Sequence, residues 1–206
     1  MFFEYNSDYM KKIFICLLLL TLCLGATNSS YAEEEKEKKT GPLSGMEFLT
    51  GFAYAKLHFK GTYDLIPIMV DFNFDFKPIL SKININLKQP VEFQIEPFFS
   101  VVYKPDNNIE TGTTFLFKIG LLPEGSKIQP YLKAGAGVMY MTQHTREQGM
   151  QFNFIEQGGV GINYFFTKNT ALTLEGRIRH LSNSGLATPN HGINTYFVIT
   201  GITYKY

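Results

Sequence analysis

The chain has 206 residues, which is enough for one domain of ordinary size. Its formal net charge is +1 and only 18% of its residues are charged, so it lacks the basic field that attracts nucleic acid. Aromatic residues, all of them phenylalanine or tyrosine, make up 15% of the chain and 18 residues are glycine, a mixture that favours strands and tight turns over helices.

The first 32 residues have the pattern of a cleavable export signal. Two lysines precede the apolar run 13–24, and the small residues at both ends of Ser30-Tyr31-Ala32 form a cleavage site. The run is too short to span a bilayer, which takes about 20 apolar residues. Both cysteines lie inside it, so cleavage would leave a mature chain without disulfides. We therefore predict a signal peptide at 1–32, a solvated charged tail at 33–45 and one domain at 46–206.

The mature chain alternates apolar and polar residues with period two, which is the pattern of β-strands. In one such segment Ile66, Ile68 and Val70 lie on one face, and Asp71 and Asn73 lie on the other. Clusters of turn residues separate eight segments of this kind, at 46–59, 63–76, 91–103, 110–122, 128–142, 151–166, 171–182 and 194–206.

Two kinds of fold could bury these strands. A soluble sandwich or lipocalin-like barrel would point the apolar faces inward, whereas a transmembrane barrel would point them at lipid. The segments are longer than the mean soluble strand of about 5–6 residues and long enough for a tilted span of about 9–11. Large aromatics crowd the apolar faces, and the last segment ends on Tyr206. The sequence therefore predicts an all-β fold, an eight-stranded antiparallel transmembrane β-barrel in the outer membrane of a bacterial cell.

An even number of strands places both ends of the barrel on the periplasmic side. The seventh strand then runs outward, and the loop 183–193 is extracellular. The linker 77–90 is long for a periplasmic turn, and its alternating part at 82–87 is a candidate for a short extra strand.

The seventh segment has two polar residues on its apolar face. Leu174 and Ile178 lie on the apolar face of the strand. The opposite face carries Glu175, Arg177 and Arg179, which we expect to form a charge network in the lumen. His180 and Ser182 have the parity of the leucine and isoleucine, so both are predicted to face lipid where the strand leaves the hydrocarbon.

Histidine followed two residues later by serine can support ester hydrolysis. An imidazole is a suitable base near neutral pH, and it could remove the proton of the Ser182 hydroxyl so that the oxygen attacks an ester. The oxyanion that forms needs hydrogen-bond donors, and Asn183, the Gly185 backbone and Asn190 are within reach in the loop. The same residue types are also common in turns and at strand ends, so the spacing alone leaves both interpretations open.

The residues 180–186 (HLSNSGL), followed by 189–193 (PNHGI), resemble the signature of the lipid A 3-O-deacylase (PagL-type) family. Weaker similarity extends through most of the mature chain, including 95–98 (IEPF) and 130–137 (PYLKAGAG). The resemblance implies an eight-stranded outer-membrane barrel that hydrolyses the ester at the 3-position of lipid A.

The resemblance also implies roles for individual residues. Ser182 matches the nucleophile, His180 the general base, and Asn190 with the Gly185 backbone the oxyanion-stabilising group, which Asn183 adjoins. The acid that orients the histidine is usually glutamate where this chain has Asn194. Asparagine can hold an imidazole by a hydrogen bond but cannot balance its charge.

The predicted function is therefore an esterase that removes the 3-O-linked acyl chain of lipid A by a Ser/His mechanism. The alternative is a structural or adhesive outer-membrane barrel with a degenerate site. The expected partners are lipid A, or lipopolysaccharide, in the outer leaflet and a second copy of the chain in a homodimer, without nucleic acid. Neither a cofactor nor a metal ion is expected, because the histidines His58, His144 and His191 show no metal-ligand spacing.

Overall fold

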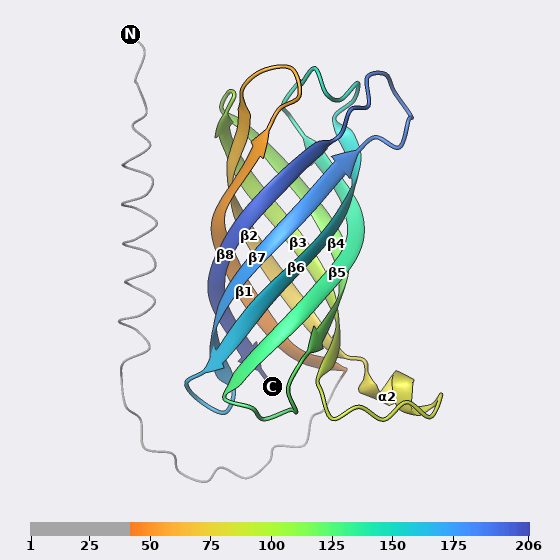
Figure 1. Ribbon diagram of the computed structural model, residues 1–206, viewed down its shortest axis with the longest axis vertical. Coiled ribbons are helices and arrows are strands. Elements are labelled where there is room, and N and C mark those ends of the chain that lie inside the picture. The colour runs from red at the N-terminus through yellow and green to blue at the C-terminus, as the bar shows by residue number, and fades with distance from the viewer. Residues whose placement is uncertain (1–41) are drawn as a thin grey trace. The chain divides into compact units, whose positions relative to one another are not determined.

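The computed structural model describes residues 42–206, so the predicted signal peptide and most of the charged tail lie outside the described residues. The chain forms a closed antiparallel barrel in which each strand pairs with the next and β8 pairs with β1 (Figure 1). The strands are β1 Leu43–Lys56, β2 Thr62–Asp75, β3 Val91–Lys104, β4 Asn108–Gly120, β5 Ile128–Met141, β6 Phe152–Phe165, β7 Thr170–Ser182 and β8 Ile193–Lys205. The eight predicted segments are confirmed, and the largest change is in β1, which begins at Leu43 instead of Met46.

The barrel places its apolar faces outside and its polar faces inside. On the outer surface Phe48, Ile68 and Val160 are 55–60% exposed, whereas the carboxylates of Glu47 and Asp71 inside are fully buried. A soluble barrel would have the reverse arrangement, so the lipocalin-like alternative is excluded. An apolar outer surface around a polar interior is the arrangement of a transmembrane barrel.

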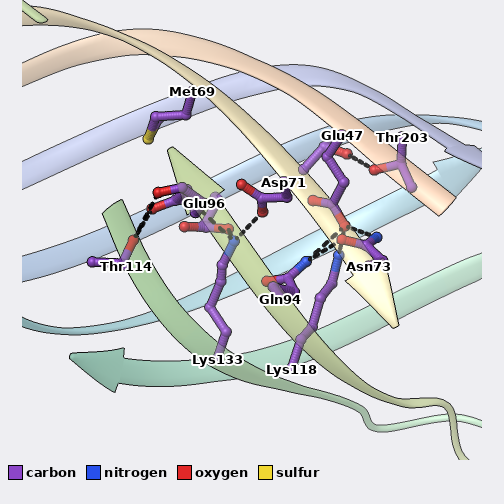
Figure 2. Close-up of polar contacts among 12 residues, drawn as sticks. Glu47, Met69, Asp71, Asn73, Gln94, Glu96, Thr114, Lys118, Lys133 and Thr203 are labelled. Atoms are coloured by element: carbon purple, nitrogen blue, oxygen red, sulfur yellow. Dashed lines mark hydrogen bonds and ion pairs between the residues drawn. The ribbon is translucent and has the colours of Figure 1, made fainter. Parts of the chain in front are cut away.

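Buried ion pairs join side chains of β1, β2, β3, β4 and β5 inside the barrel (Figure 2). Lys133 Nζ lies 3.0 Å from Asp71 Oδ2 and 3.2 Å from Glu175 Oε2, and Arg177 Nη1 lies 2.6 Å from Glu96 Oε1. The predicted charge network in the lumen is confirmed in outline. Arg177 pairs with Glu175 as well, whereas Arg179 pairs with Glu110. A barrel of eight strands has an interior just wide enough for side chains to fill.

Towards the end of β7 the interior also holds an apolar cluster, beside the buried ion pair of Arg179 and Glu110. The cluster contains Leu49, Phe98, Met139, Ile155 and Leu181. Leu181 of this cluster lies between His180 and Ser182 on β7 and points inward. The end of β7 that carries these two residues therefore packs against the cluster.

The linker between β2 and β3 contains the short helix α2 (Lys77–Ser81) and no strand, so the prediction of an extra strand at 82–87 is wrong. Pro78 lies at the start of the helix, where its fixed φ suits the first turn. The residues at 82–87 are exposed and have no strand to join, because a closed barrel leaves no free edge. In the part of the chain described here, no helix is long and apolar enough to cross a membrane.

Candidate active site

The end of β7 and the start of β8 bring three of the predicted site residues together on the outer surface. The register pairs His180 directly with Asn194. Ser182 is the last residue of β7 and pairs with Phe154 of β6. His180 and Ser182 are partly exposed and alternate with buried neighbours, and Ile178 on the same face is 54% exposed, so both point outward as predicted.

Asn194 holds the imidazole of His180. Its Oδ1 lies 2.6 Å from His180 Nδ1. A carbonyl oxygen can only accept, so Nδ1 carries the hydrogen and donates it, and Nε2 of the neutral ring keeps its lone pair. A base oriented in this way can take a proton at Nε2.

Gly192 lies beside the Cε1 and Nε2 atoms of the same ring. Its φ is +71°, and a Cβ atom built there would lie 2.5 Å from His180 Cε1 and 3.1 Å from Nε2. Only glycine fits both the backbone conformation and the space. Gly192 belongs to the signature stretch 189–193 (PNHGI), but the sequence alone gives it no separate role.

Ser182 is close to the histidine in the strand but is not bonded to it. Residues two apart on one face have Cα atoms about 6.5–7 Å apart. Within residues 42–206, Ser182 Oγ forms no hydrogen bond, so the hydroxyl can rotate towards Nε2 or towards a bound ester. Hydrogen bonds between nucleophile and base are often long without substrate.

The predicted oxyanion donors differ in availability. Asn183 is fully buried, and its Nδ2 donates to the carbonyl oxygens of Ala187 and Pro189 at 3.0 and 3.1 Å. Its Oδ1 accepts the Gly185 N–H at 2.9 Å, while its own N–H donates to Asn190 Oδ1 at 2.9 Å. These bonds fix the loop and engage two of the three predicted donors. The Nδ2 group of Asn190, which is exposed, has no hydrogen bond within the described chain.

A second loop braces the loop 183–192. The N–H of Gly149 donates to the backbone carbonyl oxygen of Pro189 at 2.7 Å, and the N–H of His191 donates to the backbone carbonyl oxygen of Glu147 at 2.9 Å. The ring of His191 also stacks on His58, with centroids 5.4 Å apart. The two backbone bonds hold the loop against the β5–β6 connection, and the His58 contact links it to the β1–β2 connection.

Comparison with known proteins decides the family. The family described as Lipid A 3-O-deacylase (PagL) matches residues 25–203, which is most of the chain and includes every site residue described above. The chain belongs to this family. The PagL-type chain is thus an outer-membrane β-barrel of a bacterial cell.

Two solved structures resemble this PagL-family chain. The crystal structure of the outer membrane enzyme PagL has 19% identity and a TM-score of 0.54, and the match covers 75% of this chain and 97% of that one. Neisserial surface protein A (NspA) has 12% identity and a TM-score of 0.55, with 79% and 96% covered. At these identities the likeness shows the fold alone. A search of curated proteins finds no match.

The PagL-family site of this chain lacks a carboxylate at the position of Asn194, and two glutamates lie on strands near it. Glu175 is buried in the lumen, where Tyr131 donates to it and Lys133 pairs with it, so it faces away from His180. Glu156 of β6 was not singled out in the sequence, yet it pairs with His180 in the register and is exposed. Among residues 42–206, no cluster of three potential ligands could hold a metal ion. The homodimer stays a prediction, because the structure describes one chain.

Proposed function

We propose that this protein is a lipid A 3-O-deacylase whose reaction is carried by Ser182 and His180. The observation that carries the proposal is the outward direction of both residues at a strand end, together with the hydrogen bond that orients the imidazole. Lipid A would reach the site sideways from the surrounding leaflet, since the ester lies where sugar meets acyl chain.

In the first step His180 Nε2 takes the proton of Ser182 Oγ, and Oγ attacks the acyl carbonyl carbon. The carbonyl oxygen becomes an oxyanion, and Asn190 Nδ2, which has no hydrogen bond within the described chain, would donate to it. The N–H of Gly185 could join it only by leaving or sharing its bond to Asn183 Oδ1. Collapse of the intermediate breaks the ester bond, and the imidazolium gives its proton to the departing 3-oxygen of the sugar.

In the second step water attacks the acyl-enzyme, with His180 again as the base. Hydrolysis frees Ser182 and releases the 3-hydroxy fatty acid that had been attached. The products are this fatty acid and 3-O-deacylated lipid A, so the reaction needs no cofactor.

The test is mass spectrometry of lipid A from cells that express the protein, with Ser182→Ala as the matched variant. We expect wild-type cells to lose the mass of one 3-hydroxyacyl group and Ser182→Ala cells to keep it. Folding of both proteins is checked by the heat-dependent mobility of barrels in gels. Identical lipid A from the two strains, with both barrels folded, would rule out the deacylase.

Asn194 favours one competing function, a structural or adhesive barrel that has lost catalysis. An asparagine orients His180 but leaves its positive charge unbalanced. Asn194→Glu distinguishes the two functions, because an enzyme limited by this residue gains rate and an inactive scaffold gains none.

A further inference from the structure

The strand register places Glu156, His180 and Asn194 in one row across β6, β7 and β8. Glu156 is the Cα partner of His180 on one side, and Asn194 is its partner on the other. Directly opposite residues on one face have Cβ atoms about 4.5–5.5 Å apart. The carboxylate of Glu156 therefore lies within electrostatic range of the imidazole, on the side away from Asn194.

Glu156 is unusual in where it points. Of the carboxylates on the eight strands, it is the only exposed one, and the other strand carboxylates are buried or partly buried. Phe154 and Val160 on the same face of β6 are apolar and 37% and 60% exposed. In the described part of the chain, Glu156 has no ion pair and no side-chain hydrogen bond. A charge on the lipid-facing surface costs free energy, and this cost is smallest near the interface.

The surroundings of His180 contain few charges. The titratable groups on the outer face around it are Glu156 on β6, Tyr196 on β8, Tyr54 and Lys56 on β1, and the loop residue His191. Only Glu156 is an anion. Among these groups, Glu156 alone could balance the charge of an imidazolium that forms when the nucleophile loses its proton.

We propose that Glu156 is a positioning residue that supplies, from β6, the negative charge that Asn194 cannot supply from β8. This inference rests on the proposed function. The two tasks of the acid in a triad are then divided: Asn194 orients the ring through Nδ1, and Glu156 balances the charge of the protonated ring.

The test compares rates of fatty-acid release from lipid A by the purified, refolded full-length mature chain. Glu156→Gln keeps the shape of the side chain and removes its charge, so we expect kcat to fall about 10–100-fold with KM unchanged. The acidic limb of the pH–rate profile should move to lower pH, because the protonated ring loses its counter-charge. Asp106→Asn removes a charge from an exposed residue of the β3–β4 loop, at the same end of the barrel, and should change neither quantity.

A second substitution tests whether charge is the cause. Asn194→Glu in the Glu156→Gln background should restore most of the lost rate, and the same substitution in the wild type should give a smaller gain. Equal gains in the two backgrounds would overturn the inference, as would a wild-type rate and pH profile for folded Glu156→Gln. An inactive wild type that matches Ser182→Ala would instead refute the proposed function itself.

Discussion

Gly192→Ala tests whether the position of the imidazole controls the rate. The added methyl group would start 2.5 Å from His180 Cε1, whereas ordinary contacts begin near 3.4 Å, so the ring must move by about 1 Å. A displacement of that size at a reacting group can cost about 10²-fold in rate. The left-handed backbone at φ +71° adds a folding cost of about 1–2 kcal/mol. We therefore expect kcat to fall about a hundredfold in a barrel that still folds.

The assay is fatty-acid release from lipid A in detergent micelles, with stability measured by urea unfolding. Gly125→Ala is the matched control, because Gly125 has a φ of +88° and nothing within 4 Å of the added Cβ. It should show a similar loss of stability and a wild-type rate. If Gly192→Ala also keeps the wild-type rate, the ring is not confined as the structure indicates.

Three further predictions concern other contacts. Asn194→Ala removes the hydrogen bond to His180 and should lower kcat about tenfold, measured in the same release assay. Lys133→Met leaves Asp71 without its buried partner and should destabilise the barrel by about 3–5 kcal/mol in urea unfolding. The hydrogen bond to Glu124 raises the pKa of Lys77. The pair therefore stabilises the folded barrel fully below the ordinary lysine pKa of about 10.4, and this stabilisation is lost as the pH rises past the raised pKa. Because both side chains are partly exposed, Lys77→Met should cost less than about 1 kcal/mol at pH 8 and nothing once the pH lies above the raised pKa.

Much of the site could be predicted because side-chain direction along a strand is a local property. Leu174 and Ile178 set the outward parity of β7, and the same count places His180 and Ser182 outside. The hydrogen bond from His180 to Asn194 was also foreseeable in kind, because the family resemblance places Asn194 beside the histidine and an asparagine amide can hold an imidazole. Neither conclusion needed knowledge of which strands are neighbours.

Other features depend on contacts between distant parts of the chain. Asn183 and Gly185 were predicted as donors from their nearness in sequence, but the folded loop already uses their N–H groups. The candidate strand at 82–87 failed for a similar reason, because alternation alone does not reveal whether an edge is open to receive it.

The sequence by itself determined the eight long strands, the face that meets lipid and the outward direction of the histidine and serine, because a period of two residues marks each strand and its faces and turn residues separate the strands. Only the tertiary structure decided that Glu156 lies beside His180 and that Gly192 presses on its ring. The physical reason is that register across strands is set by the closing of the whole barrel, and no short stretch of chain contains it.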